Sequence, residues 1–179
     1  VVTGDISQLE RFNKFILPGV GNFQNGAKKL KELSLFDFLK ELTVSEDKYL
    51  LGICLGMQLL FEKSEESEEP VEGLGLIKGN VCKFKDLGKG LKVPHMGWNY
   101  VNAASNQEIL KHLEEEARFY FVHSFFGKPN NPSNILTTTK YGNQVFCSAV
   151  VSGNIFGTQF HPEKSHKFGF SFLKGFCEL

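Results

Sequence analysis

The sequence predicts an α/β domain with a parallel core and an antiparallel edge. In the first half of the chain, short apolar runs alternate with amphipathic stretches, which is the order of β-then-α units. In the second half, short apolar runs are bounded by Gly, Pro and Asn, and Gly142-Asn143 and Gly153-Asn154 are typical of hairpin turns. At 179 residues the chain has the length of one domain, so we expect residues 1–179 to form a single unit.

The first half should contain two β-then-α units. Residues 1–5 resemble the end of a strand, and residues 6–13 a short helix. A strand over 14–17 runs into Pro18-Gly19-Val20-Gly21, where two glycines let the backbone turn and present N–H groups. The elements that follow are a helix from the N-cap Asn22 to about 33, with Phe23, Ala27 and Leu30 on one face, a helix over 35–42, a buried strand over 49–53 and a helix over 55–63.

The second half should be richer in strands. They are expected over 75–84, 91–93, 100–101 and 118–126, with a loop over 94–99, a helix over 107–116 and a β-meander after 126. The chain then ends in a helix from about Ser165, with Phe168, Phe172, Leu173 and Phe176 on one side.

Composition excludes several classes of protein. Twenty basic side chains balance twenty acidic ones, so no nucleic-acid partner is expected. No apolar run is long enough to span a membrane, and no membrane partner is expected. The four cysteines form no CxxC pair, which argues against a zinc module or a disulfide framework and favours a reducing, cytoplasmic setting. Residues 62–72, with six glutamates, are interpreted as a solvated loop.

The strongest chemical signal is Cys54, which follows the apolar run 49–53. Gly52 and Gly56 flank it at two residues on either side, the spacing of a nucleophile elbow between a strand and a helix. At a helix N-terminus, the dipole and the unpaired N–H groups would favour a thiolate. The alternative is a small buried core cysteine.

A base and a carboxylate for this nucleophile occur at His161-Pro162-Glu163. In an extended segment residues 161 and 163 share a face, so the carboxylate can bind one ring nitrogen while the other faces Cys54. The alternative is a loop histidine beside an unrelated surface glutamate. The N–H groups of Leu55 and Val20 could form an oxyanion hole, and Gln58, one helical turn after Cys54, could hold a polar substrate.

These motifs together resemble the class I glutamine amidotransferases, which have a G-x-C-x-G-x-Q elbow and an H-P-E motif. The resemblance also extends to 17–21, 94–99, 120–124 and 157–165, and so covers the whole chain. It implies a flavodoxin-like, doubly wound fold, and a glutaminase subunit that hydrolyses L-glutamine with Cys54, His161 and Glu163. It further implies that ammonia passes to a (β/α)8-barrel synthase subunit in a heterodimer, for imidazole glycerol phosphate production in histidine biosynthesis.

The resemblance also assigns binding residues. Glutamine would contact the turn at Gly19, Val20 and Gly21, together with Leu55, Gln58, Ser124 and Phe125. The partner subunit would contact Lys164 and the loop residues His95, Met96, Trp98 and Asn99. No metal or organic cofactor is implied.

Two features depart from the family pattern. Family members begin with a further strand and helix, so residues 1–179 are expected to lack that first strand and helix. Phe125 stands where the family commonly has tyrosine, which removes a hydroxyl near the glutamine pocket.

Three alternatives remain open at the level of sequence. The first is a paralogous glutaminase that supplies ammonia for the amidation of a surface sugar. The second is a non-catalytic module that docks on a synthase. The third is a metal hydrolase that uses His161 and His166, for which the spacing of other ligands gives no support.

Overall fold

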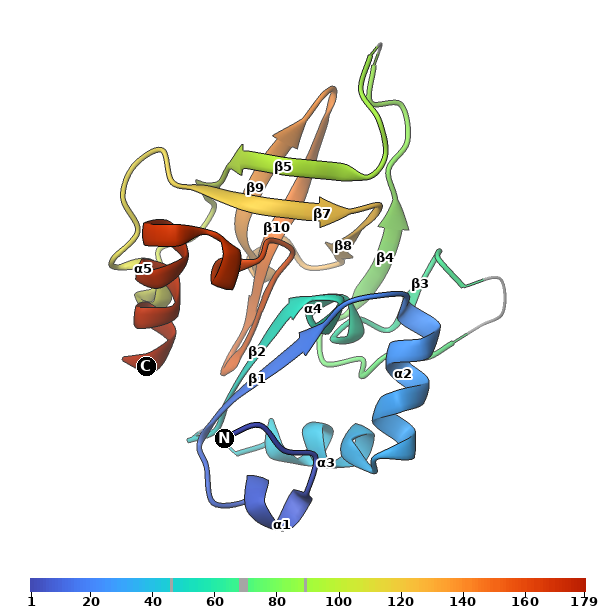
Figure 1. Ribbon diagram of the computed structural model, residues 1–179, viewed down its shortest axis with the longest axis vertical. Helices are drawn as coiled ribbons and strands as arrows, with labels where there is room; N and C mark the ends of the chain where they lie inside the picture. The colour runs from blue at the N-terminus through green and yellow to red at the C-terminus, as the bar shows by residue number, and fades with distance from the viewer. Residues whose placement is uncertain (46, 68–70, 89) are drawn as a thin grey trace.

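The computed structural model describes residues 1–45, 47–67, 71–88 and 90–179, and its main sheet has six strands (Figure 1). In spatial order these are β1 (Lys14–Gly19), β2 (Tyr49–Cys54), β11 (Ile155–Thr158), β10 (Gln144–Ser152), β9 (Ile135–Tyr141) and β6 (Asn102–Ala103). β1, β2 and β11 run parallel, whereas β10, β9 and β6 continue the sheet in antiparallel pairs. The predicted α/β class, with a parallel core and an antiparallel edge, is confirmed.

The other strands of the described residues form two smaller sheets. One contains β3 (Lys63–Ser64), β4 (Gly79–Lys83) and β8 (Phe125–Pro129). The other is the antiparallel pair of β5 (His95–Tyr100) and β7 (Arg118–His123), which crosses above the main sheet in Figure 1. Both hairpin turns predicted at Gly142-Asn143 and Gly153-Asn154 are confirmed, because Gln144 pairs with Tyr141 and Ile155 with Ser152.

The helices pack on both faces of the main sheet. They are α1 (Ile6–Leu9), α2 (Phe23–Glu32), α3 (Leu35–Leu42), α4 (Leu55–Leu59) and α5 (His166–Cys177), with short 3-10 turns η1 (Glu108–Leu110), η2 (Pro132–Asn134) and η3 (Pro162–Lys164). Asn22 caps α2 as predicted, since its side chain accepts from the N–H of Asn25.

Alternation along β2 divides the core in two. Leu50 belongs to the apolar cluster with α2, α3 and α4, whereas its neighbour Leu51 belongs to the cluster with α5 and β7. In the second cluster Phe119 stacks on Phe160 with ring centroids 4.0 Å apart, and Phe172 of α5 meets both rings edge-on. The core therefore holds β2 between two layers, with Cys54 at its carboxyl end.

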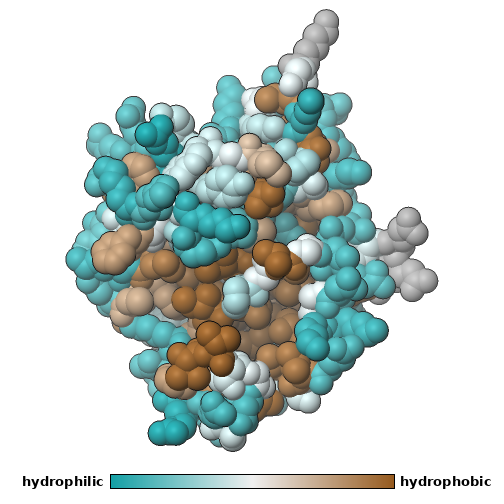
Figure 2. Space-filling view, in the orientation of Figure 1, coloured by the Kyte–Doolittle hydropathy of each residue, from teal (hydrophilic) through white to brown (hydrophobic). Residues whose placement is uncertain are grey.

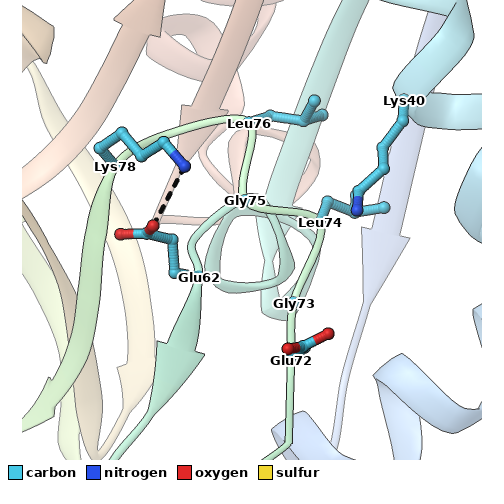
Figure 3. A pocket seen from close by; sticks show the side chains of 8 residues that line it. All are labelled: Lys40, Glu62, Glu72, Gly73, Leu74, Gly75, Leu76 and Lys78. Atoms are coloured by element: carbon cyan, nitrogen blue, oxygen red, sulfur yellow. Dashed lines mark hydrogen bonds and ion pairs between the residues drawn. The ribbon is translucent and has the colours of Figure 1, made fainter.

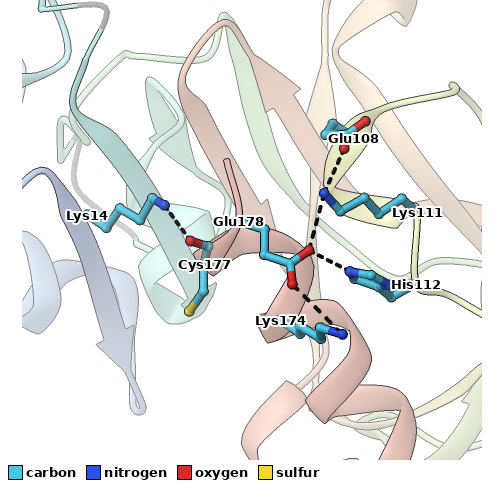
Figure 4. A network of polar contacts seen from close by, with 7 residues as sticks. All are labelled: Lys14, Glu108, Lys111, His112, Lys174, Cys177 and Glu178. Atoms are coloured by element: carbon cyan, nitrogen blue, oxygen red, sulfur yellow. Dashed lines mark hydrogen bonds and ion pairs between the residues drawn. The ribbon is translucent and has the colours of Figure 1, made fainter.

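A polar network fixes the end of α5 (Figure 4). The Glu178 carboxylate accepts from His112 Nε2 at 2.6 Å and pairs with Lys111 at 3.2 Å, while Lys14 of β1 donates to the carbonyl of Cys177. These contacts tie the C-terminal segment to the turn after η1 and to the main sheet.

β1 lies at an edge of the main sheet. The Ile16 side chain of β1 is 49% exposed. It points to the same face of the sheet as Leu51 of β2, which is its register partner and is buried. Figure 2 shows apolar side chains gathered in a hollow over this part of the sheet. The edge and one face of β1 are thus less covered than the rest of the core.

Several predicted elements are shorter than expected because tertiary contacts replace local hydrogen bonds. The helix predicted over 55–63 ends at Leu59, since the carbonyls of Leu59 and Phe61 accept from Leu74 and Gly75 instead. The helix predicted over 107–116 is reduced to η1, and the carbonyl of Ile109 lies close to Gly175 of α5.

Other expectations for the strands were wrong. Residues 1–5 are not in a strand, and the predicted strand over 91–93 is irregular; the side chain of Tyr141 binds the Lys92 carbonyl there. The predicted loop 94–99 is instead strand β5. The single strand predicted over 118–126 divides at Ser124, because β7 pairs with β5 and β8 pairs with β4.

The acidic segment 62–72 is more than a solvated loop. Glu62 accepts from the N–H of Gly79 at 2.9 Å, Glu65 from that of Lys83 at 3.0 Å and Glu66 from that of Phe23 at 2.7 Å. Residues 68–70 lie outside the described residues. The three glutamates before them link this segment to β4 and to the start of α2.

Replacement of Phe172 by alanine should lower the free energy of unfolding by about 3–5 kcal/mol, because it empties a ring-sized space in the aromatic cluster. The matched control is Phe170→Ala on the same helix, where the ring is 72% exposed and the expected change is within about 0.5 kcal/mol. Urea unfolding of both variants measures the difference, and equal losses would contradict this packing.

Candidate active site

The backbone at Cys54 makes the sharp turn that the elbow motif predicts. β2 ends at Cys54 and α4 begins at the next residue. Cys54 has φ 53° and ψ −107°, a conformation that costs energy for any residue with a Cβ. The surrounding fold holds the cysteine in this strained position at the carboxyl end of the parallel strands.

The flanking glycines are required by close backbone contacts. A Cβ on Gly52 would lie 2.6 Å from the backbone of Gly56, and one on Gly56 would lie 1.9 Å from the carbonyl oxygen of Leu17 in β1. The G-x-C-x-G spacing is therefore what allows α4 to begin against both strands.

The Cys54 side chain is buried, and its surroundings favour the thiol over the thiolate. Burial raises its pKa to about 11, which outweighs the opposing effect of the Leu55 N–H. The Sγ atom also accepts from Gln159 Nε2 at 3.8 Å, and the Glu163 carboxylate is near enough to raise the pKa further. The expectation of a thiolate favoured by the helix N-terminus was wrong for this state, because desolvation exceeds what one short helix supplies.

His161 is oriented by Glu163 as the sequence predicts. The His161 Nδ1 atom lies 2.7 Å from Glu163 Oε1, and the ring is almost completely buried. An ionised carboxylate only accepts hydrogen bonds, so Nδ1 carries the proton and Nε2 holds the lone pair. Among the described residues Nε2 is buried without a hydrogen-bond partner. The ring thus has the tautomer of a general base with its accepting nitrogen unoccupied.

Sheet topology brings the cysteine and histidine segments to one edge. β11 is parallel to β2 with Thr158 opposite Ile53, so both strands end at the same side of the sheet. His161 follows three residues later, where its N–H donates to the carbonyl of Tyr120 at 2.9 Å. Within the described residues the thiol and the imidazole share this edge without a hydrogen bond between them.

The turn over residues 19–21, predicted to supply an N–H group to an oxyanion hole, lies beside Cys54. Gly19 is the register partner of Cys54, and a Cβ on it would lie 3.0 Å from the backbone nitrogen of Gly56. The N–H of Leu55 already faces the sulfur, whereas the Val20 side chain is exposed and Gly21 has φ 101°. Both predicted donors therefore belong to segments that border Cys54.

The residues expected to bind glutamine surround the other side of the elbow. Gln58 is buried rather than solvated, and its Nε2 donates to the carbonyl of Phe125 and to Gln159 Oε1, each at 3.1 Å. Ser124 lies at the break between β7 and β8, half-buried, with its carbonyl bonded to the N–H of Phe84. Sequence reasoning assigned no role to Gln159, although in an extended segment it shares a face with His161.

Only part of the predicted partner surface is exposed. β5 is a strand, so its side chains alternate, and His95 points into the core while Asn99 binds the Lys140 carbonyl. His95 is therefore shielded from a partner by the core, whereas Asn99 is half-buried and its predicted contact with a partner stays a prediction.

The outward face of β5 carries the exposed aromatic surface that the sequence predicted in part. Met96 is 62% exposed and Trp98 45% exposed, and Tyr100 continues the same face. His166 stacks on Trp98 with ring planes 2° apart, and Lys164 lies over the ring of Tyr120. Neither Tyr100 nor His166 was predicted to belong to this surface.

Elsewhere a surface pocket contains none of the predicted catalytic residues. It is lined by Lys40, Glu62, Glu72, Gly73, Leu74, Gly75, Leu76 and Lys78, and Figure 3 shows the 3.1 Å ion pair between Glu62 and Lys78. Across the described parts of the chain, no helix has the length and apolarity of a membrane span, and no cluster of three His, Cys, Asp or Glu side chains could hold a metal ion.

The structure thus places a cysteine at a strand-to-helix elbow and a carboxylate-bound histidine at the same edge of an α/β sheet. A family model described as "Glutamine amidotransferase class-I" matches residues 7–176, and the chain belongs to this family.

Two similar proteins of known name are subunits of imidazole glycerol phosphate synthases. "Imidazole glycerol phosphate synthase subunit HisH 2" of Methanococcus maripaludis is 48% identical over 178 residues, which are 99% of this chain and 86% of that protein. The HisH subunit of Pyrococcus furiosus is 46% identical over 99% of this chain and 88% of its own length. Among solved structures, one titled "Crystal structure of glutamine amidotransferase" has a TM-score of 0.68 and 18% identity over 98% of this chain and 85% of its own, which shows the shared fold.

The raised pKa of Cys54 predicts how its alkylation by iodoacetamide depends on pH. Only the thiolate reacts, so the rate in the isolated chain should rise about tenfold per pH unit from pH 7 to 10. Mass spectrometry of the Cys177→Ser variant, which lacks the exposed cysteine, would measure it. A rate that levels off near pH 7 would instead indicate an activated thiolate in the resting chain.

Proposed function

We infer that this chain is the glutaminase subunit of an imidazole glycerol phosphate synthase. It hydrolyses L-glutamine to glutamate and ammonia, and the ammonia is used for histidine biosynthesis. The observation that carries this conclusion is 48% identity over 99% of the chain to a subunit of that name. The elbow at Cys54 and the buried pair of His161 and Glu163 supply the chemistry that such a subunit needs.

The proposed reaction begins with transfer of the thiol proton to His161 Nε2. Cys54 Sγ then attacks the side-chain amide carbon of glutamine, and His161 donates the proton to the departing nitrogen, so that ammonia leaves and a γ-glutamyl thioester remains. Water, deprotonated by the same ring, cleaves the thioester to release glutamate and restore the thiol. Glu163 holds Nδ1–H throughout and stabilises the imidazolium.

The backbone around the elbow is proposed to stabilise the tetrahedral intermediates. The N–H of Leu55 begins α4 and faces the sulfur, and the N–H of Val20 lies in the neighbouring turn between Gly19 and Gly21. Gln58 and the backbone of Ser124 and Phe125 are proposed to hold glutamine on the other side of Cys54. Phe125 contributes no side-chain hydroxyl there, which leaves its backbone as the binding group.

The partner is proposed to be a synthase subunit with a (β/α)8 barrel, in a cytoplasmic heterodimer that transfers ammonia without release to solvent. Its docking surface would be the exposed face of β5 with Met96 and Trp98, together with Lys164. This surface adjoins the His161-Pro162-Glu163 segment through the contact of Lys164 with Tyr120. An exposed tryptophan with a polar rim is typical of interface anchors.

Residues 1–179 are proposed to form one glutaminase domain, and the match of the family model to residues 7–176 supports this.

Glutamate release from glutamine tests the proposed activity, measured with and without the cognate synthase subunit and its substrate. The isolated chain should be nearly inactive, since its thiol is protonated and not bonded to His161, and the partner should increase the rate. Cys54→Ala should lower the stimulated rate by at least about a thousandfold. Cys177→Ala is the matched control and should leave the rate unchanged. Full activity of Cys54→Ala would refute the mechanism.

Trp98→Ala should weaken binding of the synthase subunit by about 2 kcal/mol or more, roughly thirtyfold in Kd, because it removes the central exposed aromatic ring. Val44→Ala, an exposed apolar residue after α3, is the control and should bind as the unmodified chain does. Calorimetric titration would measure both, and equal affinity of the two variants would place the interface elsewhere.

A further inference from the structure

The reaction described above leaves two buried histidines without a role. His95 of β5 and His123 of β7 are register partners, and both rings are almost completely buried. His95 Nδ1 and His123 Nε2 lie 3.0 Å apart. In an apolar core, each nitrogen of a buried imidazole ring is expected to have a hydrogen-bond partner.

The hydrogen bonds fix the tautomer of each ring. His123 Nδ1 lies 2.8 Å from the carbonyl oxygen of Phe125, which can only accept, so this nitrogen carries the proton and Nε2 accepts. His95 must then donate from Nδ1, which leaves its Nε2 to accept from the amide of Asn99 at 3.2 Å. Each group in this series therefore donates to the next: Asn99 to His95, His95 to His123, and His123 to the carbonyl of Phe125.

Both rings are neutral near pH 7, so this direction is maintained. Burial lowers the pKa of His95 to about 4 and that of His123 to about 3, and Phe84, Phe121 and Phe146 surround the pair.

The chain of hydrogen bonds continues from Phe125 to the nucleophile. The same carbonyl accepts a second bond from Gln58 Nε2 at 3.1 Å, and Gln58 also donates to Gln159 Oε1 at 3.1 Å. Gln159 in turn donates to Cys54 Sγ at 3.8 Å. An uninterrupted series of polar contacts thus runs from Asn99, beside exposed Trp98, to the sulfur of Cys54.

We propose that His95 and His123 are positioning residues for glutamine hydrolysis, which fix the Phe125 carbonyl and through it the amides of Gln58 and Gln159 against Cys54. The inference rests on the proposed function and adds to it a connection between the two faces of β5. Trp98 faces outward from this strand and His95 faces inward, so a displacement of β5 at the partner surface changes the contacts of Cys54. A purely structural role would make the rings interchangeable with apolar side chains of similar size.

Two substitutions at position 123 separate these roles. Asparagine can place an amide donor near the position of Nδ1, whereas leucine fills the space without any donor. In complex with the synthase subunit, His123→Leu should lower kcat for glutamine at least tenfold with a smaller change in KM, and His123→Asn should recover most of the loss. Phe84→Leu is the matched control: it disturbs packing against both rings without removing a hydrogen bond, and should lower the thermal midpoint while leaving kcat unchanged.

The alkylation rate of Cys54 by iodoacetamide provides a second readout that needs no turnover. It should differ between His123→Leu and His123→Asn in the same chain at the same pH. Equal kcat for the leucine, asparagine and unmodified proteins, or a loss of kcat equal to that of Phe84→Leu, would overturn the proposal. If His123→Leu does not fold, His95→Phe against His95→Asn makes the same comparison one ring earlier. An unmodified complex without glutaminase activity would refute the proposed function instead, and the alkylation rates would still decide the role of the pair.

Discussion

The architecture around the site depends on one backbone contact, between the Leu17 carbonyl of β1 and Gly56 at the start of α4. No side chain fits between these elements, because even a methyl group on Gly56 would overlap the carbonyl oxygen. This contact lets α4 turn back sharply over the sheet, and the turn forces Cys54 into its positive φ. Packing of α2 and α3 on one face and of α5 on the other keeps β1 and β2 in register. Packing of the core on both faces of the sheet thereby maintains the strained backbone conformation of Cys54.

Much of this could be predicted from sequence because it is local. The elbow glycines, the His161-Pro162-Glu163 spacing, the Asn22 cap and the two hairpin turns each depend on a few neighbouring residues, and each was predicted correctly. What failed was decided by distant partners. α4 is short because residues 74–77 take over its carbonyls, and β7 and β8 separate because they pair with different strands. His95 was expected at a partner surface, yet its pairing with His123 across β5 and β7 places it in the core, and no periodicity in a six-residue segment with glycine in the middle indicates which face is inward.

The protonation of Cys54 has the same origin. A helix of five residues offers a weak dipole, whereas removal of the thiolate from water carries the full desolvation cost, so burial determines the resting state. A buried, protonated thiol is less susceptible to oxidation and alkylation than an exposed thiolate. Nearby, the His161 ring is already oriented by Glu163. The step that separates the resting chain from a reactive one is therefore the formation of a contact between the sulfur and the unoccupied ring nitrogen.

The carboxylate of Glu66 connects the acidic segment 62–72 to the start of α2. It binds the first N–H of α2, the helix that follows directly after the turn at Gly19, Val20 and Gly21. A negative charge at this end of α2 offsets the positive end of the helix dipole and anchors the helix from outside the sheet. The turn is thus held at both ends, by β1 before it and by an anchored helix after it. Any rotation of its peptide groups is therefore confined to these three residues.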